Sequence, residues 1–384
     1  MVSSDVPLGA GADVGRRSTW GQALSDRPPL CTPPTGRPTR PGRWVERQPG
    51  LGLVGLLLVA PVAVVLALGA GGPETSALVL GPLVTFALPA VAMVAFWWED
   101  WPGSSLRPGW SGLVDTALVV VAAVLLTILG QAVVGRVDVG AIIDPSPGPG
   151  RVPTFPSTVP LGAAAFIAML QLTLVCEGWP LRRLPRFVAG AAALVISWLV
   201  AVAAYLLLVD VEGAPGTGLD ARTGPLTGGE LGCLLVLTGV WQVWFYVTWR
   251  GWPFAGIGRR WLRIVLANAV VLGGSGLTYI LAHGPAGVPG PVLTAFGGCY
   301  IAAGLLIGML FEGWLRSRVA VAAAVLALTA LLAAVLGWYA GTLSFSRSTA
   351  EDWVAHVGLN AIGLAVILHV AVGRRWPFSA VAET

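Results

Sequence analysis

Four carboxylates stand one or two residues before tryptophan in a phrase that recurs along the chain. The copies are Glu99-Asp100-Trp101-Pro102, Glu177-Gly178-Trp179-Pro180, Arg250-Gly251-Trp252-Pro253, Glu312-Gly313-Trp314 and Arg374-Arg375-Trp376-Pro377. Carboxylates that reach a membrane surface could act as acids or bases on a lipid or isoprenoid. Two copies carry arginine at this position, and a site that needed an acid in every copy would not allow that. The inner-face acidic candidates are Glu99, Asp100, Glu177 and Glu312. Of these, Glu99, Glu177 and Glu312 could pair with arginines at the surface.

Three histidines are the residues that could ligate a metal or haem. His356 and His369 share one apolar segment, about 20 Å apart along a helix, and His283 ends an earlier segment. Two haems bound between two helices need two histidines at this spacing on each helix. No other segment carries such a pair of histidines. We therefore predict no cofactor and no metal, with His283, His356 and His369 as the only candidate ligands.

Neutral polar residues inside apolar segments form the second set of candidates. They are Gln171, Gln242, Asn268 and Asn360. Amides at membrane depth either hydrogen-bond across helices or line a ligand cavity. The glycines at 273–276 leave two alternatives open as well: close helix packing, or a broken helix whose freed backbone lines a cavity, as in transporters.

The elements that must position these residues are membrane helices. Only 11% of residues are charged and 55% are hydrophobic, with a mean hydropathy of +0.78, whereas soluble domains carry about 25% charged residues. Crossing the hydrocarbon takes about 20 apolar residues. We predict an all-α integral membrane protein with ten such helices, at 51–72, 76–97, 111–134, 158–177, 187–210, 229–249, 262–283, 291–312, 318–342 and 351–373.

The recurring phrase ends every second segment, which predicts five parallel two-helix hairpin repeats. Tryptophan prefers the headgroup level of a membrane, and proline after it stops the helix. The phrase is therefore interpreted as a helix stop with an interfacial anchor. The anchors are Trp101, Trp179, Trp252, Trp314 and Trp376.

Charge along the chain predicts its orientation. All 23 basic residues are arginine, and 19 of them fall in the N-terminal segment or on the side of the tryptophan phrases. The positive-inside rule then places both termini in the cytoplasm and the chain in the cell (inner) membrane. Residues 1–49 are rich in arginine and proline and are expected to be a disordered tail. The transmembrane domain is expected at 50–378, with a short cytoplasmic end at 379–384.

These features indicate an integral membrane protein but do not identify its role. The leading hypothesis is a permease-like or cavity-forming protein for a small neutral or lipid-like molecule. The alternatives are a membrane-embedded enzyme acting on a lipid or isoprenoid, and a non-catalytic assembly subunit of a membrane complex. The expected partners are the lipid bilayer and either another membrane protein or further copies of this chain. Nucleic acid is not expected, because the arginines form no single patch.

Overall fold

The computed structural model describes residues 47–107, 110–135, 137–146, 154–210 and 223–377. In these residues the secondary structure is helical, apart from one isolated bridge between Val209 and Leu226. Nine of the described helices are long and apolar enough to cross a membrane. The predicted class, an all-helical protein of the multi-pass membrane type, is confirmed.

The nine helices correspond to nine of the ten predicted segments. They are α2 (Gly50–Leu68), α3 with its π-helical end (Pro73–Trp97), α4 (Trp110–Val134), α7 (Arg186–Leu208), α8 with η6 (Gly228–Thr248), α9 (Arg260–His283), α10 with η8 (Gly290–Leu310), α11 (Arg318–Ala340) and the last span (Ala350–Val372). The segment predicted at 158–177 is a shorter helix of α6 and η4, Val159–Val175.

Shorter elements complete the described part of the chain. The last span is divided into α12 (Ala350–Ala355), η9 (His356–Ile362), α13 (Gly363–Ile367) and η10 (Leu368–Val372). The connections contain η3 (Gly103–Ser105), α5 (Gly140–Ile143), η5 (Leu181–Arg183) and η7 (Phe254–Gly256).

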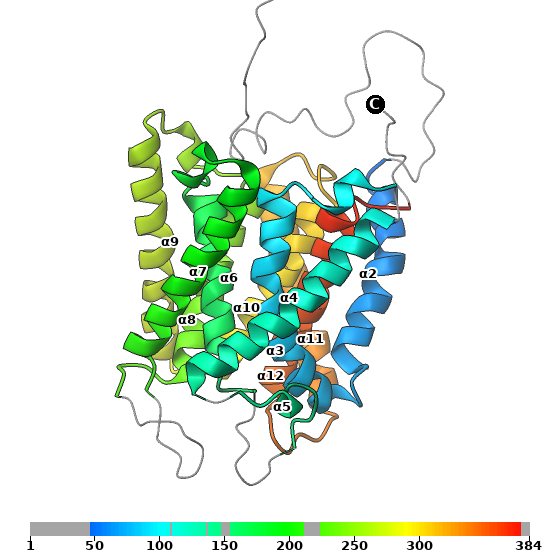
Figure 1. Ribbon diagram of the computed structural model, residues 1–384, viewed down its shortest axis with the longest axis vertical. Coiled ribbons are helices and arrows are strands. Elements are labelled where there is room, and N and C mark those ends of the chain that lie inside the picture. Colours follow the sequence, from blue (N-terminus) through cyan, green and yellow to red (C-terminus); the bar gives the residue numbers. More distant parts are fainter. Residues whose placement is uncertain (1–46, 108–109, 136, 147–153, 211–222, 378–384) are drawn as a thin grey trace, which may run out of the picture.

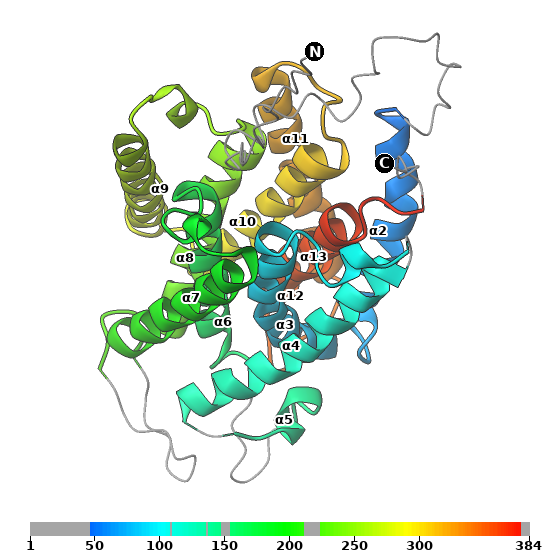
Figure 2. The same cartoon turned by 45° about the horizontal axis from the view of Figure 1, so that its top comes forward.

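The helices form an inner and an outer shell. The inner shell consists of α3, α6, α8, α10 and the last span, each packed on the next, with the last span also contacting α3. The outer shell consists of α2, α4, α7, α9 and α11, which lie at the periphery in Figure 2. Most residues of α9 and α11 face outward, whereas most of α3 and the last span are buried.

Helices on either side of a tryptophan phrase pack extensively on each other. Thus α4 packs on α3, α7 on α6, α9 on α8 and α11 on α10, while α2 packs on η9 of the last span. The predicted hairpin partners contact each other less: α4 touches α6 only slightly, and α9 and α10 have no extensive contact. The unit of packing is therefore an inner helix, a tryptophan turn and the outer helix that follows.

Small residues let the inner helices approach closely. A Cβ on Gly358 would lie 2.6 Å from the backbone carbon of Gly298, so η9 and α10 meet backbone to backbone. A Cβ on Gly304 or Gly308 would collide with a valine methyl of η6. The GxxxG spacing of α10 thus serves close packing, as such motifs do between membrane helices.

Five turns of one geometry end the inner helices, and we call them tryptophan turns 1 to 5 (residues 98–102, 176–180, 249–253, 311–315 and 373–377). Each follows a π-helical stretch, and each tryptophan N–H donates to the carbonyl three residues earlier, at 2.8–3.2 Å. Left-handed φ values lie just before each tryptophan, where glycine is favoured, for example +71° at Gly178 and +84° at Gly251. The turns lie at one end of the bundle, the upper end in Figure 1, which we call the tryptophan face.

The predicted tail at 1–49 lies almost wholly outside the described residues, as does the C-terminal end at 379–384. The described chain begins with contacts to the bundle. Gln48 donates from Nε2 to the carbonyl of Leu310 at 2.9 Å, and its Oε1 accepts from the N–H of Gly52. Gln48 therefore already belongs to the packed structure.

Candidate functional site

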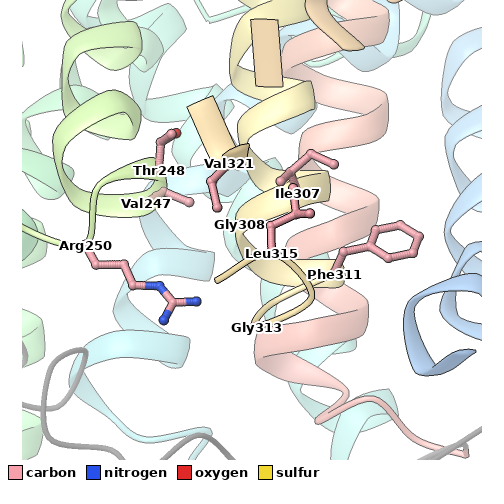
Figure 3. A pocket seen from close by; sticks show the side chains of 9 residues that line it. All are labelled: Val247, Thr248, Arg250, Ile307, Gly308, Phe311, Gly313, Leu315 and Val321. Atoms are coloured by element: carbon pink, nitrogen blue, oxygen red, sulfur yellow. The ribbon is translucent and has the colours of Figure 1, made fainter. Parts of the chain in front are cut away.

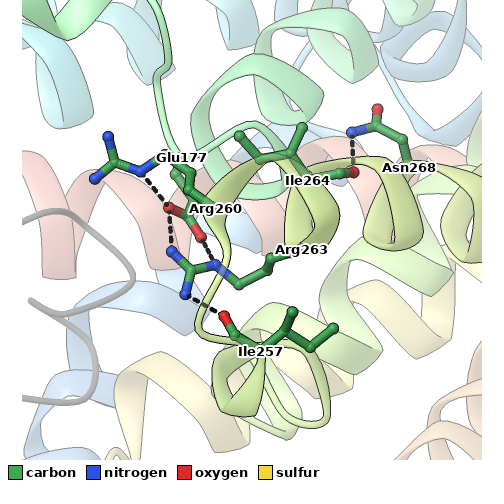
Figure 4. A network of polar contacts seen from close by, with 6 residues as sticks. All are labelled: Glu177, Ile257, Arg260, Arg263, Ile264 and Asn268. Carbon is green, nitrogen blue, oxygen red and sulfur yellow. Dashed lines mark hydrogen bonds and ion pairs between the residues drawn. The ribbon is translucent and has the colours of Figure 1, made fainter.

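Glu177 of turn 2 is bound by arginines at the start of α9 (Figure 4). Its side chain is 10% exposed and forms ion pairs with Arg263 and, at 3.8 Å, with Arg260. Arg263 also donates to the carbonyl of Ile257 at 3.1 Å. Burial lowers the pKa of nearby Arg182 to about 10, which leaves this guanidinium charged at neutral pH. Glu177 therefore fastens turn 2 to the next outer helix.

The acids of turn 1 bind arginines from two other places. Glu99 lies 3.6 Å from Arg186, the first residue of α7. Asp100 lies 3.0 Å from Arg374 of turn 5, which also donates to the carbonyl of Glu99. Burial raises the pKa of the Asp100 carboxyl to about 6, against the lowering effect of Arg374.

Glu312 of turn 4 is paired in the same way. Arg375 of turn 5 lies 3.4 Å from its carboxylate and donates to the carbonyl of Met309 at 2.8 Å. All four candidate acids are thus ion-paired, and turn 5 supplies arginines that bind acids of turns 1 and 4. The arginines of turn 5 are therefore explained by the acids that they bind, whereas Arg250 of turn 3 has no such partner among the described residues.

Asp115 is an ionisable residue in the second turn of α4. It is fully buried in α4, and its Oδ1 accepts from the N–H of Gly103 at 2.8 Å. A Cβ on Gly103 would collide with Asp115 Oδ2, so η3 needs glycine here. Asp115 holds η3 against α4, a role that the sequence offered no signal for.

Three of the candidate cavity residues bind one another. Gln242 of α8 donates from Nε2 to Gln171 Oε1 of η4 at 2.7 Å, and Gln171 donates to Asn268 Oδ1 of α9 at 2.9 Å. Asn268 donates to the carbonyl of Ile264 at 2.8 Å. The chain of amides joins three helices, which is the packing alternative. One oxygen, Gln242 Oε1, has no partner among the described residues.

Asn360 and His356 hold the last span to α2 and α3. Asn360 donates from Nδ2 to the carbonyl of Gly81 at 3.3 Å, and His356 Nε2 lies 3.0 Å from the carbonyl of Leu66. The indole N–H of Trp353 donates to the neighbouring carbonyl of Ala67 at 3.1 Å. Carbonyls in the last turn of a helix lack intrahelical partners, so these side chains complete the end of α2.

The histidines lie in separate environments. His283 Nδ1 lies 3.1 Å from the carbonyl of Val288, and its ring stacks on Tyr279. His369 is buried in η10, where a Cβ on Gly55 of α2 would lie 3.0 Å from its Nε2. Across the described residues, no group of three or more histidine, cysteine or acidic side chains could hold a metal ion.

Helix α9 is continuous through its glycines. It runs from Arg260 to His283, so the broken-helix alternative is wrong. Gly274 faces Trp241, whose ring would lie 2.8 Å from an added Cβ, whereas Gly273 and Gly276 face open space. Trp241 also donates to Thr278 on the same helix at 3.1 Å. The glycine cluster makes room for an aromatic ring of α8.

Two hollows lie at opposite ends of the bundle. The first has a volume of about 10 Å³, room for roughly one water, and lies between turn 3, turn 4 and the start of α11 (Figure 3). The second has about 200 Å³ and is an open recess lined by residues 71–75, Leu343 and Ser344. Neither is lined by Gln171, Gln242, Asn268 or Asn360.

Glu74 makes a polar cluster at the opposite end of the bundle that sequence reasoning missed. Its carboxylate accepts from the backbone N–H groups of Ser346, Arg347 and Ser348 and from the Ser346 hydroxyl. Arg347 in turn donates to the carbonyl of Pro145 at 2.9 Å. Glu74 stands at the start of α3 and binds the connection before α12, a pairing between distant segments that spacing alone cannot reveal.

Comparison with known proteins gives no relative. No protein-family model matches the chain, and no curated protein or solved structure is significantly similar to it. The function must therefore be argued from the contacts themselves.

Proposed function

We propose that this protein is a non-catalytic assembly subunit of a membrane complex. The observation that supports this most is the chain of amides from Gln242 through Gln171 to Asn268. Side chains that would line a permeation path are used instead to join inner and outer helices. The inner-face acids are likewise neutralised by arginines, which disfavours an acid–base site on a lipid or isoprenoid.

The topology that goes with this proposal has ten spans in five hairpins, with both termini in the cytoplasm. It counts the helix Val159–Val175 as a span, because a tryptophan turn follows it as one follows each other inner helix. The outward faces of α9 and α11 then offer apolar surface to lipid and to another membrane protein. Cysteines placed in 137–146 should be labelled from outside the cell only, and labelling from the cytoplasm would overturn this orientation.

Native mass spectrometry of complexes extracted with their lipids tests the assembly role. We expect the full-length chain to emerge in a fixed stoichiometric ratio with a second membrane polypeptide or with further copies of itself. An extracted population of monomers carrying only lipid would overturn the proposal. The variant Trp338→Ala on the outward face of α11, where Trp338 is 73% exposed, should weaken the complex, while Trp110→Ala on α4 serves as a matched control.

A permease-like role for a small neutral or lipid-like molecule is the second candidate. It is favoured by the π-helical stretch of His356–Ile362 in the buried last span, because π-turns within helices are frequent at functional sites. In this role the π-helical stretch rearranges to open a path for the transported molecule. Asn360→Leu should then abolish uptake of a small neutral molecule into proteoliposomes. It should not change the complexes seen by mass spectrometry. Unchanged uptake would remove the second candidate.

A further inference from the structure

Arg250 differs from the equivalent charges of the other tryptophan turns. Glu99, Glu177, Glu312 and Arg374 each have an ion-pair partner. Arg250 is exposed, and within the described ranges it has no ion pair. Its guanidinium is therefore available to bind an anion.

The hollow beside Arg250 has a buried hydroxyl in its wall. Thr248 lines this hollow with Arg250, Gly313 and Val321 (Figure 3). Its side chain is 3% exposed. Its Oγ1 makes no hydrogen bond of standard geometry among the described residues, although the buried Tyr300 hydroxyl lies close enough to interact with it. A buried hydroxyl that makes no hydrogen bond of good geometry is unfavourable, so a ligand or water that reaches it is stabilised.

The third wall is the start of α11. Its N-cap residue Ser317 makes no side-chain cap, although the helix is 23 residues long. The free N–H groups and the dipole of such an end favour an anion. Arg318, the first helical residue, lies over the ring of Trp252 at 5.8 Å from its centroid and adds positive charge.

The position of this hollow relative to the bilayer indicates which kind of anion it binds. Trp252 and Trp314 flank it from turns 3 and 4 and are 45% and 46% exposed. Half-exposed tryptophans belong at the headgroup level of a bilayer. Phosphate is the anion found at that depth, and basic recesses between membrane helices bind anionic headgroups.

We propose that the mouth of this hollow binds the phosphate of an anionic phospholipid. The Arg250 guanidinium and the first N–H groups of α11 contact the phosphate oxygens. The hollow itself has room for one water, which joins the phosphate to the Thr248 hydroxyl. The site is independent of the assembly role, because it needs no second polypeptide.

Lipid retention by the full-length chain tests this site. The protein is placed in nanodiscs of phosphatidylcholine with added phosphatidylglycerol, and the phosphatidylglycerol retained on the chain is measured by native mass spectrometry. Arg250→Gln should lower its affinity about tenfold or more, as expected for a lost charge-assisted contact. Thr248→Val keeps the shape, removes the hydroxyl and should lower the affinity severalfold.

Arg259→Gln is the matched control, because Arg259 is an exposed arginine of the same connection that does not line the hollow. We expect it to keep the affinity within about fivefold, the effect of one arginine near a charged surface. Equal losses for Arg250→Gln and Arg259→Gln would overturn the site in favour of general surface attraction. Competition by inorganic phosphate as effective as by phosphatidylglycerol would overturn the lipid as the ligand. Circular dichroism of each variant confirms that it is folded.

Discussion

The Arg374 guanidinium Nε lies 3.0 Å from Oδ2 of Asp100, which ties the last tryptophan turn to the first. The Asp100 side chain is 13% exposed and that of Arg374 45% exposed, so the contact lies at the edge of the bundle with the acid on the inner side. Arg375, the next residue, binds Glu312. Two consecutive arginines thus close the ring of inner helices.

Removing the arginine of this pair should destabilise the protein. Arg374→Gln leaves a mostly buried carboxylate without its partner, and we expect the free energy of unfolding to fall by about 1–2 kcal/mol at pH 8. Unfolding in mixed micelles measures this. In an Asp100→Asn background the same change should cost less than about 0.5 kcal/mol, and an equal cost in both backgrounds would show that the pair is not coupled.

The stability of the protein should fall as pH rises from about 4 to about 6. The Asp100 pKa is raised by burial from 3.8 to about 6, so the folded state binds more protons than the unfolded state in this range. A tenfold difference in proton affinity between the two states corresponds to about 1.4 kcal/mol. Asp100→Asn should therefore match the wild type at pH 4 and exceed its stability at pH 8 by up to about 3 kcal/mol. A variant no more stable at pH 8 would contradict the burial argument.

The amide chain should contribute to packing between helices. Gln242→Leu removes the hydrogen bonds to Gln171 and to the carbonyl of Ile167, and such bonds are worth about 0.6–2 kcal/mol in membranes. We expect a loss of that size in thermal unfolding, and a similar loss for Asn268→Leu. Losses that add fully in the double variant would show that the two residues do not act through Gln171.

Replacing a packed glycine and an open-facing glycine of α9 by alanine should have different effects on stability. Gly274→Ala places a methyl group 2.8 Å from the ring of Trp241 and should separate α9 from α8, with a loss of about 1–3 kcal/mol. Gly276→Ala faces open space and removes a helix-weakening glycine, so it should be neutral or stabilising by up to about 1 kcal/mol. Equal effects on thermal unfolding would mean that the α8–α9 contact is not tight.

The sequence predicted the helices well because each apolar run is long and the tryptophan phrase marks where every inner helix ends. It indicated that the glutamates of the phrase could pair with arginines, but not with which ones. Glu177 binds Arg263, 86 residues away, and Asp100 binds Arg374, 274 residues away. Such partners depend on how the helices are arranged, which periodicity does not contain.

The sequence also did not predict that each inner helix packs on the outer helix that follows it across a tryptophan turn. The recurring phrase predicted two-helix hairpins closed by the loops opposite the tryptophan face. The extensive contacts of α4, α7, α9 and α11 run instead across the tryptophan turns. The contact between Asp115 and η3 was not predicted, because η3 is too short to leave a pattern in the sequence.

The closing of the last turn on the first has a consequence for how a cell makes this protein. Asp100 and Glu312 are synthesised long before the arginines at 374 and 375 that neutralise them. The helix α2 likewise leaves the ribosome first but packs on the last span. The nascent chain must therefore hold its earlier segments without these partners until the last span and turn 5 have been synthesised.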